Sequence, residues 1–353
     1  MGNKMNLNAM ISPNPNDTKS DDICLRSKVD TGYKCNLKCN FCYTLKNIHD
    51  NPKPFLDICK ILDKLKASGI KEVEFSGGEP TIHPNWFELL EYANNIFKHV
   101  SVVTNGTKLY KEDFLLASKE LGLKEILFSL HGWDDSSHDH KVGRKSFYKI
   151  INAIDLAKKH GLIVRINCVL DNTFNPTQYA RLINQIKPKQ VNFLPLNYWS
   201  DAKNISKLDY TRASEHIKIC IDAIKLRNDY TDINVRYIPF CFMEGYEKYC
   251  VGTYQHIFDK TDWNIITYNG RENSETFLTD ELIITKEEMF KKAKINRFNT
   301  YIKPPSCTDC SMMYVCDGIE KELVEQTNKL VPKFGAKIKD INFFKELRSG
   351  KSS

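Results

Sequence analysis

The sequence lacks any apolar run long enough to cross a bilayer, and its first residues lack the apolar stretch of a signal peptide. We therefore expect a cytoplasmic protein that binds no membrane. The sequence also lacks a dominant charge of one sign, because 51 Lys and Arg stand against 44 Asp and Glu, a net charge of +7. The excess of basic residues is spread along the chain, and these residues are concentrated only around Lys329–Lys339. We therefore do not expect nucleic-acid binding.

No internal repeat is visible beyond an alternation of short strand-like and helix-like segments. The 353 residues, 41% hydrophobic and 27% charged, suffice for a barrel-sized domain and a smaller one. We expect a flexible leader at residues 1–22, which are rich in Asn, Pro, Ser and Asp. A barrel domain is expected at residues 23–232, and a smaller cysteine-rich domain with a tail at residues 233–353, where the alternation fades.

The fold class is indicated by six short runs rich in Val, Ile, Leu and Phe, which are typical of buried strands. These runs are Leu25–Asp30, Glu72–Ser76, Val100–Thr104, Glu125–Ser129, Leu162–Val169 and Gln190–Leu194. Amphipathic segments between them, such as Pro54–Ser68 and Ser146–His160, predict helices. We predict an α/β fold, a partial (β/α)6 TIM-like barrel, in which the loops after the strands build the active site.

Twelve cysteines in a protein expected in the cytoplasm are not typical of disulfides. Three of them form a C-x3-C-x2-C run, Cys35, Cys39 and Cys42, directly after the first predicted strand. Three thiolates on one loop can bind three irons of a four-iron cluster and leave the fourth iron open to a chelating ligand. The alternatives are a structural zinc site, with His49 as a possible fourth ligand, or three buried thiols without a metal.

A second motif, Ser76-Gly77-Gly78-Glu79-Pro80, follows the second predicted strand. Together with the cysteine run, in which Phe41 precedes the last cysteine, it resembles the radical S-adenosylmethionine (radical SAM) superfamily over about Leu25–Leu196. The resemblance implies that Cys35, Cys39 and Cys42 bind a [4Fe-4S] cluster with an open iron site. It also implies that Phe41, Gly77, Gly78 and Glu79 contact S-adenosylmethionine, with the Glu79 carboxylate facing its amino group.

The resemblance implies further cofactor contacts at the ends of the later strands. The matching residues are Thr104, Asn105, Ser129, Asn167 and Leu194. Polar residues at strand ends also commonly cap loops, so this second interpretation stays open for each of them. Many members carry Ser-x-Asp on the fourth strand, whereas this chain has Ser129-Leu130-His131, so no substrate-binding Asp is expected there.

A second cysteine group, Cys307, Cys310 and Cys316, has the spacing C-x2-C-x5-C. It resembles the auxiliary-cluster extensions called SPASM and twitch, which implies one auxiliary [4Fe-4S] cluster in a twitch-like domain. Cys241 is the preferred fourth ligand, and Cys250 is its rival. A second auxiliary cluster would lack ligands, because no cysteine follows Cys316. A structural zinc knuckle is the alternative, since C-x2-C is equally typical of zinc.

The resemblance therefore predicts an enzyme that reductively cleaves S-adenosylmethionine to a 5′-deoxyadenosyl radical, which abstracts hydrogen from a substrate. A small molecule or a peptide is the expected substrate, and an electron donor such as flavodoxin or ferredoxin the expected partner. Two other classes stay open from the residues alone. These are a zinc-binding interaction protein, and an iron–sulfur electron carrier or sensor that does not cleave S-adenosylmethionine.

Overall fold

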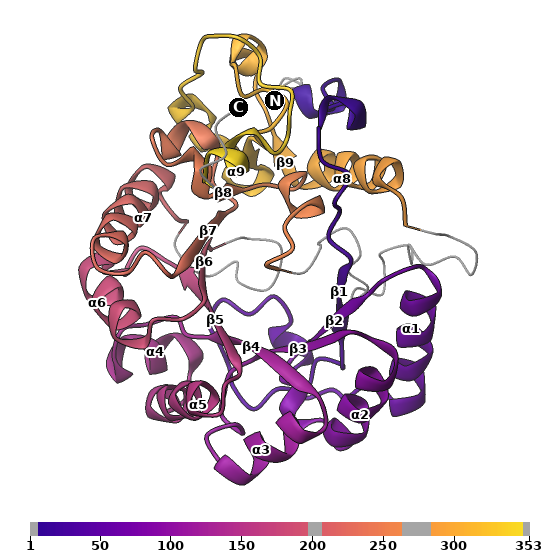
Figure 1. Cartoon of the computed structure of the whole chain (residues 1–353). Coiled ribbons are helices and arrows are strands. Elements are labelled where there is room, and N and C mark those ends of the chain that lie inside the picture. Colours follow the sequence, from indigo (N-terminus) through magenta and orange to yellow (C-terminus); the bar gives the residue numbers. More distant parts are fainter. Residues whose placement is uncertain (1–5, 197–206, 263–283, 349–353) are drawn as a thin grey trace.

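The computed structural model describes residues 6–196, 207–262 and 284–348, and its main feature is an eight-stranded parallel sheet in the order β1 to β8 (Figure 1). The strands are β1 (Arg26–Asp30), β2 (Glu72–Ser76), β3 (His99–Thr104), β4 (Leu123–Ser129), β5 (Ile163–Leu170), β6 (Gln190–Pro195), β7 (Asp232–Arg236) and β8 (Cys250–Val251). The sheet is curled into a partial barrel. All six predicted strands are present within two residues of their expected ends, and the predicted fold class is confirmed.

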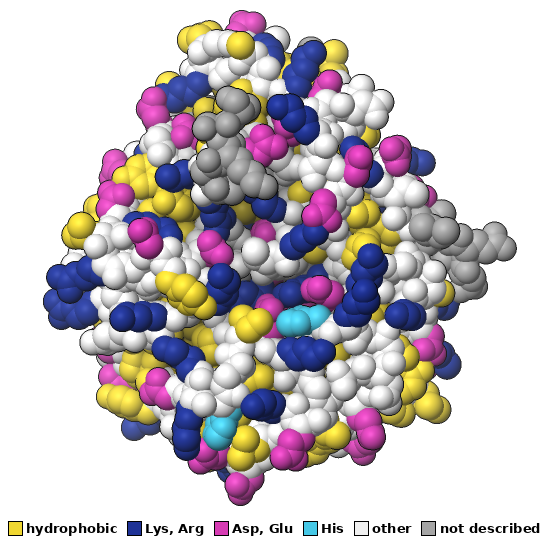
Figure 2. All heavy atoms as spheres, in the orientation of Figure 1, with side chains coloured by type: hydrophobic (Ala, Val, Ile, Leu, Met, Phe, Trp, Pro, Cys, Tyr) yellow, Lys and Arg dark blue, Asp and Glu magenta, His cyan; other side chains and the backbone are white. Residues whose placement is uncertain are grey.

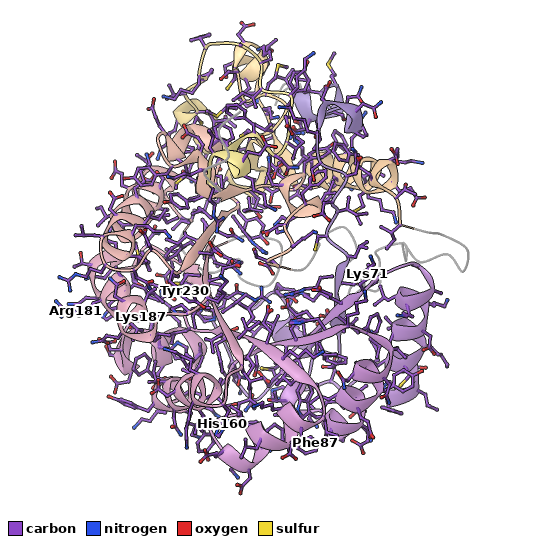
Figure 3. All side chains as sticks on the ribbon, in the orientation of Figure 1. Lys71, Phe87, His160, Arg181, Lys187 and Tyr230 are labelled. Carbon is purple, nitrogen blue, oxygen red and sulfur yellow. The ribbon has the colours of Figure 1, made fainter. Side chains whose placement is uncertain are left out.

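Helices cover the outer side of the curled sheet in Figure 1. They are α1 (Phe55–Ala67), α2 (Trp86–Ile96), α3 (Glu112–Glu120), α4 (Asp135–Val142), α5 (Phe147–Lys159), α6 (Pro176–Ile186) and α7 (Tyr210–Lys225). Their apolar residues recur every three or four positions; α1 buries Ile58, Leu62 and Leu65 in this way. Phe87 and His160 lie at the outer rim in Figure 3, away from the inside of the barrel.

The two faces of the sheet differ in chemistry. Alternate residues such as Val73, Phe75 and Phe128 are fully buried in the hydrophobic core. The residues between them, such as Glu74 and Arg165, are also buried but carry charges. Because strand side chains alternate between faces, the apolar set packs under the helices and the polar set fills the barrel interior. The hollow at the centre of the face in Figure 2 is rimmed by Lys, Arg, Asp and Glu side chains.

The interior charges form one network across several strands. Arg26 of β1 pairs with Glu125 of β4, with 2.7 Å between Nη1 and Oε1. Arg165 of β5 pairs with Glu74, with Glu125, and with Asp262 at 3.2 Å between Nη1 and Oδ1. Burial by itself would raise the pKa of Glu125, but the charges of Arg165 and Arg26 lower it below the ordinary value. The network therefore compensates charges that would be costly to bury alone.

Glu125→Gln is expected to lower the free energy of unfolding by about 3–5 kcal/mol near neutral pH, because it leaves two arginines buried without full compensation. The folded-state pKa is depressed, so the carboxylate stabilises fully above the ordinary pKa of 4.5 and loses this effect as the pH falls below it. Urea unfolding measures the free energy of unfolding of wild type and variant, once near neutral pH and once below the ordinary pKa. The difference between the two free energies should be smaller at the lower pH. Glu112→Gln is the control, because Glu112 pairs with Lys159 at the surface. Equal losses in the two variants would contradict the prediction.

The C-terminal region lies beside the open side of the sheet. It contains α8 (Lys286–Thr300), α9 (Phe343–Arg348) and an antiparallel pair of β9 (Tyr301–Ile302) with β10 (Ile319–Glu320). The segment after β8 lies next to the chain that enters β1, because Cys24 N donates to Ile257 O at 2.6 Å. Residues 6–22 contact this region too: Asn8 Nδ2 donates to Asp317 O at 3.0 Å.

Two strands, β7 and β8, were not predicted from the sequence. β7 pairs with β6 from Gln190–Asp232 to Phe193–Val235, and β8 pairs with β7. The expected boundary between residues 232 and 233 therefore falls within β7, and the sheet continues on both sides of it. In the part of the chain that the structure describes, no helix has the length and apolar character needed to span a membrane.

Candidate active site and cysteine centres

The first cysteine group lies on the loop that follows β1. Cys35, Cys39 and Cys42 are partly exposed, and none of them forms a disulfide. Burial, followed by the charge of Glu79, raises the pKa of Cys35 to about 11. Burial also raises the pKa of Cys39, followed by the charges of Cys42 and Cys35. These mutual effects indicate that the sulfur atoms lie near one another, and three soft donors on one loop fit an iron–sulfur cluster bound as thiolates.

Helix α4, which was not predicted, holds this loop in place. Lys38 N donates to Val142 O at 3.1 Å, and Asn40 N donates to Lys141 O at 2.9 Å. The last carbonyls of α4, which have no partner inside the helix, thereby bind the backbone between the cysteines. The signals for α4 in the sequence were Asp134 as its N-cap and Gly143 just past its end, where φ is 69°.

The two glycines of the Gly-Gly-Glu-Pro motif pack against the chain that leads into Cys35. Gly78 N donates to Gly32 O, and Glu79 N donates to Lys34 O, both at 2.9 Å. A Cβ atom on Gly77 would lie 2.2 Å from Gly32 O, and one on Gly78 would lie 2.2 Å from Lys34 O. The two glycines therefore allow the backbone at the end of β2 to approach the backbone of residues 32–34 closely. This contact positions the cysteine loop relative to the end of β2.

The Glu79 side chain is 2% exposed and connects the ends of β2 and β3. Its Oε1 accepts hydrogen bonds from Thr81 N at 3.1 Å, Thr81 Oγ1 at 2.5 Å and Thr104 Oγ1 at 2.7 Å. Its Oε2 accepts from Asn105 N at 2.7 Å. Burial raises the pKa of Glu79, while these hydrogen bonds oppose the rise. Oε2, with a single donor in the described part of the chain, keeps room for a further donor.

Asn105, expected at the cofactor, also binds the cysteine loop. Its Nδ2 donates to Asn36 Oδ1 at 2.8 Å, and its Oδ1 accepts from Thr107 Oγ1 at 2.6 Å. Asn36 Nδ2 in turn donates to Thr107 Oγ1 at 2.7 Å. The structure therefore brings the ends of β1, β2 and β3 together, with Glu79 and Asn105 as the links.

The remaining predicted contacts line the ends of β4 to β6 and are partly exposed. Ser129 is opposite Asn167 in the sheet register, and Val169 is opposite Leu194. Asn167 Oδ1 accepts from Asn192 Nδ2 at 2.8 Å. That bond holds the Asn167 amide in one orientation at the strand end.

Phe41, between the second and third cysteines, contacts His131, with ring centroids 4.8 Å apart and the rings nearly perpendicular. His131 is 4% exposed, and its Nδ1 accepts from Val169 N at 3.1 Å. Burial lowers the pKa of His131. The ring is therefore neutral with its proton on Nε2, and it packs against Phe41 from the loop that follows β4.

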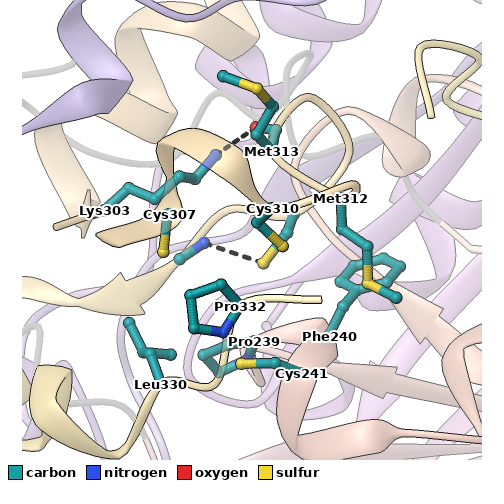
Figure 4. A pocket seen from close by; sticks show the side chains of 12 residues that line it. Pro239, Phe240, Cys241, Lys303, Cys307, Cys310, Met312, Met313, Leu330 and Pro332 are labelled. Atoms are coloured by element: carbon teal, nitrogen blue, oxygen red, sulfur yellow. Dashed lines mark hydrogen bonds between the residues drawn. The ribbon is translucent and has the colours of Figure 1, made fainter. Parts of the chain in front are cut away.

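The second cysteine group surrounds a small cavity in the C-terminal region (Figure 4). The residues that line it include all four predicted ligands, Cys241, Cys307, Cys310 and Cys316, together with Lys303. Burial raises the pKa of Cys241 to about 12, followed by the charge of Cys316 and then those of Cys307 and Cys310. Cys310 Sγ accepts from Lys333 N at 3.4 Å, a backbone contact that a thiolate would strengthen.

Cys250, the rival fourth ligand, is fully buried but does not line this cavity. Its Sγ lies 4.0 Å from Tyr246 O. Four thiols around one cavity fit a cluster with a complete protein ligand set. Among residues 6–196, 207–262 and 284–348, no three His, Cys, Asp or Glu side chains are grouped as ligands of a single metal ion.

Residues 29–186, which include the cysteine loop, the glycine motif and the ends of β1 to β5, match the model of the Radical SAM superfamily. The chain is 33% identical over 148 residues to the antilisterial bacteriocin subtilosin biosynthesis protein AlbA of Bacillus subtilis (strain 168). The matched segment covers 40% of this chain and 32% of AlbA. It is 26% identical over 212 residues to the mitochondrial GTP 3′,8-cyclase of Arabidopsis thaliana, covering 56% of this chain and 53% of the cyclase.

A solved structure, native anSMEcpe with bound AdoMet and Cp18Cys peptide, has a similar fold, with a TM-score of 0.54 and 15% identity over 92% of this chain and 95% of that chain. The chain therefore spans about a third of the length of AlbA and about half of the length of the Arabidopsis cyclase.

Proposed function

The chain belongs to the radical SAM superfamily through residues 29–186, and on this premise we propose that it reductively cleaves S-adenosylmethionine at a [4Fe-4S] cluster held by Cys35, Cys39 and Cys42. Membership implies the cluster and the cofactor, and it places the chain among the enzymes of this superfamily. When bound, these groups supply a 5′-deoxyadenosyl radical that abstracts hydrogen from the substrate. The substrate is a small molecule or a peptide.

The observation that carries the proposal is the junction of the cysteine loop with the Gly-Gly-Glu-Pro motif. The backbone of Gly78 and Glu79 pairs with Gly32 and Lys34, directly before Cys35. An amino-acid group chelating the open iron would therefore lie close to Glu79, whose Oε2 has room for an ammonium donor. An iron–sulfur electron carrier or a zinc protein has no need of such a carboxylate.

The other residues of the site have distinct tasks in this proposal. Ser129 and Asn167 offer hydrogen bonds to the polar groups of S-adenosylmethionine, and Leu194 offers an apolar contact to its adenine. Thr104 and Asn105 act mainly through Glu79 and the cysteine loop, because their polar atoms already bind there.

The direct test is anaerobic reconstitution with iron and sulfide, reduction with dithionite, and measurement of 5′-deoxyadenosine. Formation of this product without any added substrate establishes the activity. GTP and the Cp18Cys peptide are the first substrate probes, because the similar proteins include a GTP 3′,8-cyclase and a structure with that peptide bound. A reconstituted chain that holds the cluster but forms no 5′-deoxyadenosine would exclude the proposed function.

We also propose one auxiliary [4Fe-4S] cluster bound by Cys241, Cys307, Cys310 and Cys316. The common cavity of these four thiols supports this ligand set over one that contains Cys250. Four thiolates leave no iron of that cluster open, so we propose that it carries electrons and does not bind substrate. The electron donor is a low-potential carrier such as flavodoxin or ferredoxin.

Cys241→Ala is expected to remove about four of about eight irons per chain, because one of the two clusters loses a ligand. Cys250→Ala is the matched control and should keep the full iron content. Iron and acid-labile sulfide analysis after anaerobic reconstitution measures both. If Cys250→Ala loses iron and Cys241→Ala does not, the ligand assignment is wrong. Zinc without sulfide in the wild-type chain would favour the zinc knuckle instead.

A further inference from the structure

A buried lysine forms part of the wall of the four-cysteine cavity. Lys303 follows β9, is 1% exposed, and lines the cavity together with Cys241, Cys307 and Cys316. Figure 4 shows its side chain beside Cys307, with its Nζ directed to the backbone of Met313. That hydrogen bond, from Nζ to Met313 O, is 2.6 Å long.

In the described part of the chain, the Lys303 ammonium donates one hydrogen bond, to the neutral carbonyl of Met313, and it forms no ion pair with a carboxylate. Asp317, a buried acid that acts electrostatically on Lys303, already has other partners. It pairs with Arg297 at 3.6 Å between Oδ1 and Nε, and it accepts from Thr253 N at 2.7 Å. Arg297 is itself buried and adds a second positive charge nearby. Burial, followed by the charge of Arg297, lowers the pKa of Lys303 to about 7. A buried ammonium at this position is therefore stable only beside a negative charge that the carboxylates do not supply.

The acidic groups that face Lys303 are the thiols. Cys316 and Cys307 are among the groups that act electrostatically on it, together with Asp317. Thiols become anions when they bind iron, and four thiolates around one cluster leave that site with net negative charge. The missing anion is therefore the loaded cysteine site itself.

We propose that Lys303 is the built-in counter-charge of the auxiliary iron–sulfur site and that it raises the reduction potential of this site. The inference rests on the proposed auxiliary cluster and extends it by naming the residue that sets its electron affinity. In the test, dithionite reduces the site by one electron and is itself oxidised. No bond is made or broken in the site. A positive charge on Lys303, in the wall of the cavity, stabilises the extra electron. This electrostatic stabilisation is stronger in the buried surroundings than in water, because their dielectric constant is low.

The test uses the full-length chain in which Cys35, Cys39 and Cys42 are replaced by Ala, so that only the auxiliary site gives a signal. A potentiometric titration followed by electron paramagnetic resonance measures its midpoint potential. Lys303→Met, of similar length and no charge, is expected to shift the midpoint to lower potential. Lys303→Arg keeps the charge and should stay close to the parent value.

The outcomes separate this inference from the proposed function. A Lys303→Met chain with full iron content and an unchanged midpoint would overturn the inference. If Lys303→Met fails to load iron while Lys303→Arg loads it, the need for a positive charge is supported. If neither variant loads iron, shape and not charge is decisive, and the inference is wrong. A parent chain that itself holds no iron at these cysteines contradicts the auxiliary cluster, whatever the role of Lys303.

Discussion

Cys42→Ala is expected to abolish the formation of 5′-deoxyadenosine, to below about one thousandth of the wild-type rate, because the radical chemistry depends on an intact cluster. Cys42 is the last of the three thiols on the loop after β1, and its loss leaves two ligands for three irons. The iron content should fall by about four per chain, with the auxiliary cluster retained. Anaerobic turnover with dithionite, together with iron and sulfide analysis, measures both effects.

Cys59→Ala is the matched control for that variant. Cys59 is a buried thiol on α1 that belongs to neither cysteine group. Its replacement removes one sulfur from the core and should leave turnover and iron content unchanged. A Cys42→Ala chain that keeps full turnover would refute the ligand assignment on which the proposed function depends.

Gly78→Ala is expected to give the second-largest effect, a loss of cluster and of turnover by at least about tenfold. The added Cβ would lie 2.2 Å from both Tyr33 O and Lys34 O, so the backbone before Cys35 must move. Overpacking of this kind typically costs about 1–3 kcal/mol, and the displaced segment carries the first ligand. Iron content and 5′-deoxyadenosine formation measure the displacement, and thermal unfolding measures the stability.

Gly161→Ala separates local displacement from general destabilisation. Gly161 ends α5 with φ of 73°, and a Cβ there would meet nothing within 4 Å. This variant should lose stability through backbone strain, by about 1 kcal/mol, yet keep the cluster and its turnover. If Gly78→Ala retained its cluster as well as Gly161→Ala does, the glycine would not be needed to position the cysteine loop.

Much of the barrel followed from local pattern. The strands from β1 to β6 and the helices α1 and α5 were predicted within two residues, because each presents an apolar face whose period is visible in the sequence. Helix α4 was missed, although Asp134 and Gly143 cap its ends, because Val142 is its only buried apolar residue. β7 and β8 were missed because they are short or lie in a stretch without clear alternation.

The sequence by itself determined the two cysteine groups and the Gly-Gly-Glu-Pro motif, because ligand spacing and turn-forming glycines are properties of a few consecutive residues. It also determined the strands from β1 to β6 and several of the helices between them, through the period of the apolar positions. Only the tertiary structure decided which distant groups meet: Cys241 with Cys307, Glu79 with Asn105, and Lys303 with the second cysteine group. These contacts depend on how the sheet curls and how the C-terminal region lies against it, which no local pattern records.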